Sequence, residues 1–162
     1  MFRKIVLGAG LLGAMISTAQ AATVTANLGV QITLTAACTV TGGTLNFGTQ
    51  GVLASNIDNT ATLTVTCTNT TPYNVGLDKG SFGTAVNARK MKGGATNTEF
   101  VNYALYSDTG RTLNWGNTVG TDTVTGNGNG SAQTHFVYGR VPSQSSGSPG
   151  VYNDTVTITV TY

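Results

Sequence analysis

Charged side chains are scarce in this sequence: lysine, arginine, aspartate and glutamate together make up 9% of its 162 residues. Arg3 and Lys4 account for the formal net charge of +2, so the rest of the chain is balanced. The one local cluster of cations, Arg89, Lys90 and Lys92, is expected to lie on a solvated loop. This charge distribution is not that of a nucleic-acid-binding protein.

Residues that commonly carry out catalysis or bind metals are also rare. His135 is the only histidine, and it is expected in a strand without a catalytic partner. The few carboxylates are scattered, and no local spacing pairs two of them for acid–base chemistry. Two cysteines and one histidine cannot supply the four ligands of a zinc site. We therefore predict no catalytic residue, no metal site, no cofactor and no small-molecule substrate, and hence no enzyme.

No segment is apolar for long enough to span a membrane comfortably. Residues 1–21 instead have the three parts of a secretory signal peptide: the basic pair Arg3 and Lys4, an apolar stretch from Ile5 to Ile16, and the small-residue cleavage site Ala19-Gln20-Ala21. The apolar stretch has about 12 residues, whereas a spanning helix needs about 20. Residues 22–162 are therefore expected to be exported, and their length suits one domain.

Export bears on the two cysteines, Cys38 and Cys67. In an oxidising compartment, two cysteines favour one disulfide. The loop that such a bond would close predicts a stabilisation of roughly 3–4 kcal/mol. A catalytic thiol would need an adjacent base and an unpaired cysteine, and it is the less favoured alternative.

What the sequence does contain is alternation of apolar and small or polar residues. Directly after the signal peptide, six apolar residues recur at every second position, which predicts a strand of about 11 residues with one apolar edge. They are Val24, Ala26, Leu28, Val30, Ile32 and Leu34. Two interpretations are open: this is the first strand of the chain's own sandwich, or a segment that completes the sandwich of another molecule.

Similar alternation, with threonine on the polar positions, continues along the chain. It predicts strands at Thr23–Ala37, Thr44–Gly48, Thr60–Thr68, Tyr73–Asp78, Phe100–Ser107, Arg111–Trp115, Gln133–Val141 and Val151–Tyr162. Segments rich in glycine and asparagine, such as Thr125–Ser131, are expected to be turns. No window has a helical period. The expected fold is all-β, an antiparallel sandwich of immunoglobulin-like type.

The last predicted strand runs to the final residue of the sequence. Its apolar positions are Tyr152, Val156, Ile158, Val160 and Tyr162. No later segment is present to pair with it as a hairpin. We therefore expect this strand to have an unpaired edge, which proteins normally cover.

Six blocks, in order, carry a family resemblance. They are Cys38-Thr-Val, Leu45-Asn-Phe-Gly48, Val65-Thr-Cys67, Tyr103-Ala-Leu-Tyr-Ser-Asp108, Val137-Tyr-Gly-Arg-Val-Pro142 and the terminal block from Gly150 to Tyr162. With them the chain resembles the spore coat protein U domain, which is also the subunit domain of archaic chaperone–usher pili. The resemblance covers residues 36–162, and the terminal block is its most specific part.

The resemblance implies an incomplete immunoglobulin-like β-sandwich that lacks its last strand and is completed by donor-strand complementation. Residues 22–33 would be the donor extension and residues 34–162 the domain. Ile32 and Leu34 could instead belong to the domain's own first strand. The implied donor residues are Val24, Ala26, Leu28, Val30 and Ile32. The implied acceptor groove and chaperone edge consist of Tyr152, Val156, Ile158, Val160 and Tyr162.

The resemblance also implies partners and a location. The partners would be a periplasmic chaperone, an outer-membrane usher and neighbouring subunits of a head-to-tail polymer. The chain would pass through the periplasm to a cell-surface pilus that serves attachment and biofilm formation. One alternative is a secreted coat protein of spores or the cell surface with the same fold. Another is a monomeric carbohydrate-binding module that uses Trp115 and tyrosines, and such a module would be stable alone and bind glycan.

Overall fold

The computed structural model describes residues 20–162, and the chain divides into two units between Thr33 and Leu34. The predicted signal peptide, residues 1–21, lies almost wholly outside the described residues. In the first unit, residues 20–33 form no regular secondary structure and their side chains are exposed. Val24 and Leu28, for example, are 94% and 88% exposed. The strand predicted over Thr23–Ala37 is therefore not formed in the isolated chain.

The second unit consists of strands and loops, without a helix in residues 34–162. The strands are β1 (Cys38–Thr41), β2 (Ile57–Cys67), β3 (Pro72–Leu77), β4 (Arg89–Gly93), β5 (Glu99–Tyr106), β6 (Val124–Asn127), β7 (Ala132–Val141), β8 (Tyr152–Asn153) and β9 (Ile158–Thr161). One sheet has the order β1-β2-β7-β5-β4-β8, and the other has the order β6-β3-β9. Over the described residues, no helix could cross a membrane.

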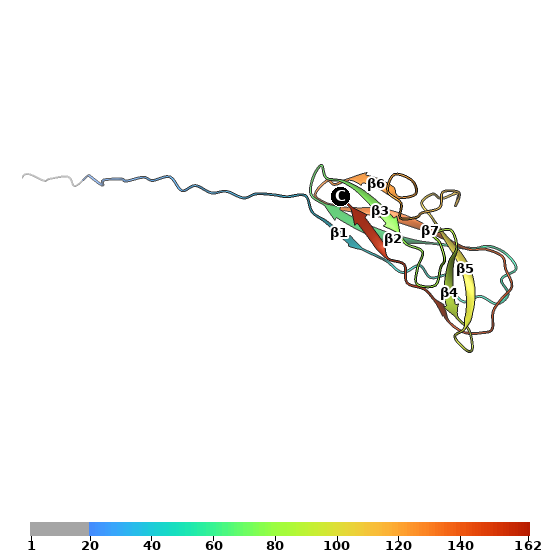
Figure 1. Cartoon of the computed structure of the whole chain (residues 1–162). Helices are drawn as coiled ribbons and strands as arrows, with labels where there is room; N and C mark the ends of the chain where they lie inside the picture. The colour runs from blue at the N-terminus through green and yellow to red at the C-terminus, as the bar shows by residue number, and fades with distance from the viewer. Residues whose placement is uncertain (1–19) are drawn as a thin grey trace, which may run out of the picture. The chain divides into compact units, whose positions relative to one another are not determined.

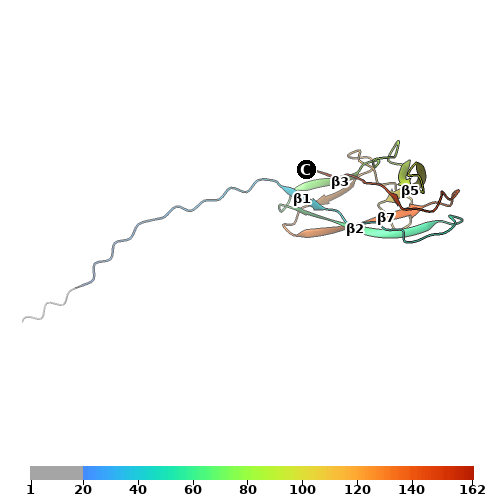
Figure 2. The same cartoon turned by 90° about the horizontal axis from the view of Figure 1, so that it is seen from below.

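The two sheets face each other across one hydrophobic core. Figure 1 shows the strands of the domain, and Figure 2 places β3 in a layer over β2 and β7. Alternation along the strands sends every second side chain inward, so Leu63 and Val65 of β2 meet Val75 and Leu77 of β3 within one buried cluster. The predicted all-β, incomplete immunoglobulin-like sandwich is confirmed.

Four of the predicted strands form with ends shifted by a few residues: β2, β3, β5 and β7. Two others are wrong. Arg111 has a left-handed backbone (φ 56°), and the carboxylate of Asp108 accepts hydrogen bonds from the amides of Thr112 and Leu113, so 111–115 is a capped turn. Residues 44–48 lie in no strand, although Leu45 and Phe47 pack against the core as their alternation predicts.

Three strands were not predicted: β1, β4 and β6. β4 contains Arg89, Lys90 and Lys92, so the expectation of a solvated loop there is wrong. β6 lies partly within Thr125–Ser131, which was expected to be a turn. It forms a strand because Tyr73 and Val75 of β3 offer it an edge for pairing. All three are short strands with few apolar residues, and they form because a longer neighbour supplies the hydrogen bonds.

The predicted terminal strand is present as two short strands on different sheets. β8 pairs with β4 in the larger sheet, and β9 pairs with β3 in the smaller one. Residues 154–157 cross between the sheets without strand pairing. The period of two is kept throughout, because Tyr152, Val156, Ile158 and Val160 are all half-buried while their neighbours in sequence are more exposed.

A disulfide joins Cys38 to Cys67, as predicted, and closes a loop with a sequence separation of 29. The two residues lie opposite each other in the β1–β2 ladder. β1 is short and mostly exposed, so few apolar contacts hold it in place. The disulfide therefore adds a covalent tie to the hydrogen-bonded ladder that joins β1 to β2.

Cys38→Ser should lower the free energy of unfolding by about 3–4 kcal/mol, because the unfolded chain regains the entropy of the open loop. Urea denaturation of purified protein measures the loss. Reduction of the wild-type disulfide should give the same shift, which serves as the control. A midpoint unchanged by the substitution would mean that β1 pairing is maintained without the covalent bond.

Candidate functional site: a groove between the two sheets

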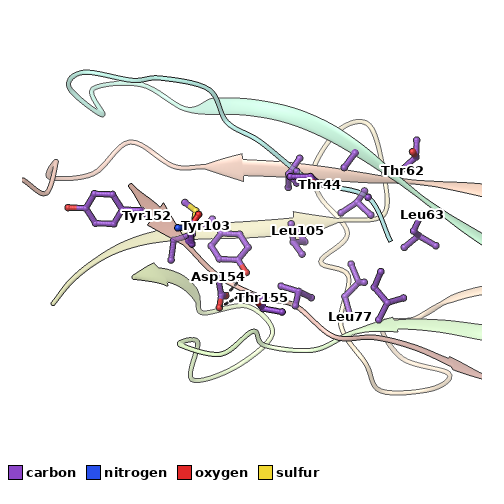
Figure 3. A pocket seen from close by; sticks show the side chains of 17 residues that line it. Thr44, Thr62, Leu63, Leu77, Tyr103, Leu105, Tyr152, Asp154 and Thr155 are labelled. Carbon is purple, nitrogen blue, oxygen red and sulfur yellow. Dashed lines mark hydrogen bonds between the residues drawn. The ribbon is translucent and has the colours of Figure 1, made fainter. Parts of the chain in front are cut away.

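An open groove of about 340 Å³ runs into the domain between its two sheets. Figure 3 shows its lining side chains, with Tyr103 and Asp154 toward one end and Leu63 and Leu77 toward the other. The lining comes from seven segments of the sequence: residues 43–45, β2, the end of β3, the inward faces of β4, β5 and β7, and residues 152–158. Segments far apart in the chain thus meet at this groove.

The floor of the groove is the hydrophobic core itself. Leu63, Leu77 and Leu105 line it and are 2–4% exposed. Val137 lies on the same floor and is 8% exposed. Such side chains are normally covered by a further strand or helix. Here a shallow layer of half-buried residues at the rims is all that lies between the core and solvent.

The rims of the groove are backbone segments with unpaired edges. One rim is residues 43–45, which belong to no strand, and the other runs from Asp154 to Ile158. Among residues 20–162, β9 pairs with β3 and with no strand on its other side. Thr157 bonds to Asp78 on the β3 side of this rim, and the opposite edge, which no strand of the described residues pairs with, gives an added strand a place to form hydrogen bonds.

Two glycines narrow the groove at its β9 end. A Cβ atom on Gly42 would lie 2.8 Å from Cδ1 of Ile158, and one on Gly43 would lie 2.5 Å from the carbonyl oxygen of Thr62. Only a residue without a side chain allows the rim to approach so closely. Gly42 and Gly43 lie at the border of the groove, directly after the end of β1 at Thr41.

The other end of the groove is polar. The hydroxyl of Tyr103 donates to Oδ2 of Asp154 (2.7 Å), whose Oδ1 accepts from the amide of Ser81 (2.8 Å). Burial, followed by this hydrogen bond and the charge of Asp154, raises the pKa of Tyr103 well above its ordinary value. Tyr103 is therefore a neutral donor at every physiological pH, and it holds the rim at Asp154 in place.

A second carboxylate ties the same rim to β3. Oδ1 of Asp78 accepts from the amides of Gly80 and Thr157, both at 2.9 Å. Burial alone would raise the pKa of Asp78, but these hydrogen bonds and the charge of Arg89 hold it below its ordinary value. The carboxylate is thus ionised and anchors the crossing segment between β8 and β9.

Beneath this polar end lies Arg89, the first residue of β4, with no exposed surface. Its guanidinium donates to the backbone carbonyls of Leu77, Asp78 and Trp115 at 2.7–2.8 Å. Burial lowers the pKa of Arg89, while Tyr103 and the nearby carboxylates act in the opposite direction. The side chain joins β3, β4 and the loop at Trp115, so it stabilises the wall from which the groove is built.

The predicted acceptor residues are distributed as follows. Tyr152, Val156 and Ile158 line the groove. Val160 is half-buried against the core beyond it, and Tyr162 is 59% exposed and is not part of the lining. The predicted donor residues belong to the other unit, where Val24, Leu28, Val30 and Ile32 are 82–94% exposed and Ala26 is exposed as well.

Sequence reasoning missed most of the groove, including its floor, the rim at 43–45 and the Tyr103–Asp154 pair. The sequence predicts a turn at Gly42 and Gly43, and Asp154 was not among the predicted groove residues of the terminal strand. Asp154 in fact occupies an inward position, in step with Tyr152 and Val156. This period of two is visible in the sequence, and from it the side chain of Asp154 could have been predicted to point inward.

The remaining candidates for chemistry are structural. Nε2 of His135 lies 2.9 Å from the hydroxyl of Tyr73, and burial lowers the pKa of His135 and raises that of Tyr73. In this contact the hydroxyl of Tyr73 and Nε2 of His135 each find a hydrogen-bond partner beside the core. Trp115 is 1% exposed and donates to the carbonyl of Val75, so it cannot stack on a glycan. Within residues 20–162, no group of His, Cys, Asp and Glu is arranged to hold a metal.

Comparisons with known proteins agree with this architecture. Protein U of Myxococcus xanthus is 37% identical over 161 residues, covering 90% of this chain and 89% of that protein. The crystal structure of the CsuC–CsuE chaperone–tip adhesion subunit pre-assembly complex, from the archaic chaperone–usher Csu pili of Acinetobacter baumannii, contains a chain with a similar fold. The TM-score is 0.58 at 23% identity, and the match covers 80% of this chain and 40% of that chain. Residues 24–159 match the Spore Coat Protein U domain, and the chain belongs to that family.

Proposed function

We propose that this protein is a non-enzymatic structural subunit of an archaic chaperone–usher pilus. In this proposal, subunits polymerise head to tail by donor-strand exchange. Residues 22–33 of one subunit occupy the groove of the next and pair with the free edge of β9. The observation that carries the proposal is a groove whose floor is the domain's own hydrophobic core and whose rims have unpaired backbone edges.

The character of the groove supports an occupant that is a strand. Its floor is apolar, while its rims offer amide and carbonyl groups in extended chain. A helix would satisfy its own backbone and leave the rims unpaired, whereas a strand satisfies both. Its side chains at every second position would face the floor, so the occupant should have apolar residues at a period of two.

The first unit of this chain has that pattern. Val24, Leu28, Val30 and Ile32 are exposed apolar residues at a period of two, with Ala26 between them. Burial of these side chains should contribute on the order of 5–10 kcal/mol at about 25 cal/mol per Å². Each backbone hydrogen bond to a rim should add roughly 0.5–1.5 kcal/mol. Because donor and acceptor are different surfaces, the polymer is an open filament.

A subunit with an open groove needs a partner before it polymerises, because an uncovered apolar groove and free strand edges promote aggregation. We infer that a periplasmic chaperone occupies the groove first, and that an outer-membrane usher then exchanges it for the donor segment of the next subunit. The fold shared with a chain of a chaperone–subunit complex supports this order. The pilus would be displayed at the cell surface after export through the periplasm and would serve attachment and biofilm formation.

A second candidate keeps the same fold and groove in a different assembly. The protein would then be a secreted coat component of spores or of the cell surface. The 37% identity to Protein U across nearly the whole chain favours this candidate. The two candidates share donor-strand exchange and differ in whether an usher is required.

The test of the proposed polymerisation is the mass distribution of the exported protein, with and without residues 22–31. We expect ladders or fibres from the full protein and only single subunits, free or bound to chaperone, from the truncated one. Deletion of the usher gene should abolish surface fibres for a pilus but not for a coat. A single stable subunit in both forms would contradict the proposal.

A further inference from the structure

The outer face of the larger sheet, opposite the groove, carries exposed aromatic rings interleaved with cations. We call it the basic aromatic face and define it by Lys90, Lys92, Phe100, Phe136, Tyr138 and Arg140. Val101 and Tyr103 of β5 and Val137 and Val141 of β7 point into the core, so the residues next to them point outward. β7, β5 and β4 are neighbours in the sheet. The face is therefore continuous across three strands.

At the β4 side, two lysines lie over two phenyl rings. Nζ of Lys90 is 5.7 Å from the centroid of Phe100, and Nζ of Lys92 is 5.6 Å from that of Phe82. The two rings are 6.3 Å apart, and Phe82 and Phe100 are 40% and 48% exposed. These cation–π contacts hold the ammonium groups beside the rings while leaving both accessible to a ligand.

At the β7 side the same arrangement recurs with arginines. Phe136 and Tyr138 are stacked with centroids 6.3 Å apart, and Phe136 is 52% exposed. The guanidinium carbon of Arg111 is 5.9 Å from the ring of Tyr138. Arg140 lies one outward position further along β7. The register places Ala104 of β5 opposite Arg140, and outward-facing Asn102 lies between Ala104 and Phe100, so the two clusters are separate patches on one face.

The charge of the face is strongly one-sided. The outward positions of β2, β4, β5 and β7 carry a single carboxylate, Asp58, which Arg140 contacts twice at 2.7 Å and Arg111 approaches at 3.4 Å. The remaining cations of the domain are used internally: Arg89 is buried, and Nζ of Lys79 donates to the carbonyl of Gly83. Asp58 therefore partly neutralises Arg140 and Arg111, whereas Lys90 and Lys92 have no carboxylate partner among the described residues, so the excess positive charge lies at the β4 side of this face.

We propose that the basic aromatic face binds a linear acidic polysaccharide. The flat outer surface of a sheet suits an extended chain, exposed aromatic rings stack on the apolar faces of sugar rings, and the cations pair with carboxylates of uronic acid residues. The charge complementarity selects an anionic polymer, and the paired aromatic rings favour sugars over a purely electrostatic partner. This site is separate from the groove, so a subunit could bind polysaccharide while it is part of a polymer.

The test is binding of the purified protein to immobilised polygalacturonate, with neutral dextran as the comparison polymer. We expect binding to polygalacturonate alone, weakened by added salt. The pair Lys90→Gln and Lys92→Gln should reduce affinity about tenfold, and Phe136→Ala should reduce it several-fold. Lys79→Gln removes the same charge elsewhere and should leave affinity within about twofold of wild type.

Three outcomes would overturn this assignment. They are absence of binding to polygalacturonate, an equal loss of affinity in Lys79→Gln, and equally tight binding of duplex DNA that Phe136→Ala does not affect. The lysine pair should polymerise as wild type does, since Lys90 and Lys92 face away from the groove. Failure of polysaccharide binding is thereby distinguished from failure of donor-strand exchange.

Discussion

Leu28→Asp should abolish head-to-tail polymerisation while the domain of residues 34–162 folds normally. Leu28 is the central apolar residue of the proposed donor segment and is 88% exposed in the isolated chain. The substitution therefore removes no packing contact from the unpolymerised subunit and should not change its free energy of unfolding. In the polymer, by contrast, a carboxylate would have to enter an apolar groove, at a cost of several kcal/mol. The measurement is the length distribution of fibres, together with the yield of the chaperone-bound subunit.

The matched control for this variant is Asn27→Asp. It introduces the same charge one position away, on the side of the segment that would face solvent in the polymer. We expect fibres of normal length from Asn27→Asp. If Leu28→Asp also forms normal fibres, the donor assignment is wrong. If both variants fail, the charge of the segment matters and its alternation does not.

Arg89→Met should lower the free energy of unfolding by about 3–5 kcal/mol, a large fraction of the stability of a domain of this size. Methionine fills a similar volume but donates no hydrogen bond. The carbonyls of Leu77, Asp78 and Trp115 would then be buried without the donors they have now. Each unsatisfied buried carbonyl costs about 1–3 kcal/mol. Urea denaturation followed by circular dichroism measures the change.

Lys90→Met is the control for Arg89→Met, because it makes the same kind of change at the next residue of β4, whose side chain points outward. Its effect on the free energy of unfolding should stay within about 0.5 kcal/mol. A loss below about 1 kcal/mol in Arg89→Met would mean that water or another donor replaces the guanidinium. Since Leu77 lines the groove, we also expect Arg89→Met to reduce polymerisation in proportion to its loss of folded subunit.

The sequence was most informative where apolar and polar residues alternate over eight or more positions. β2 and β5 were predicted from alternation of threonine, asparagine or alanine with Val, Leu or Tyr, and β7 from its β-forming composition; the three strands form the centre of the larger sheet. The pairing of Cys38 with Cys67 was also predicted, because an oxidising compartment leaves two cysteines few alternatives. Local pattern and covalent chemistry were sufficient in these cases.

Prediction failed where an inward position holds a polar residue. In β4, Arg89 points inward and Lys90 and Lys92 point outward. The sequence of this strand therefore resembles that of a charged loop. Its inward arginine is tolerated only because three carbonyls from β3 and the Trp115 loop converge on it. Asp154 is a similar case, since Tyr103 and Ser81 satisfy its carboxylate inside a strand-like period. Neither partner set is local in sequence.

The sequence by itself determined the fold class, the strand faces and the exposed alternating segment at residues 24–32, because these depend on periodicity within a single stretch of chain. It also determined the family, through blocks in a fixed order. Only the tertiary structure decided that the terminal strand divides between two sheets, that a groove reaches down to Leu63, Leu77 and Leu105, and that Lys90, Lys92, Arg111 and Arg140 share one face. These features depend on which distant strands pair, and strand pairing is set by the packing of the whole sandwich and not by any one segment.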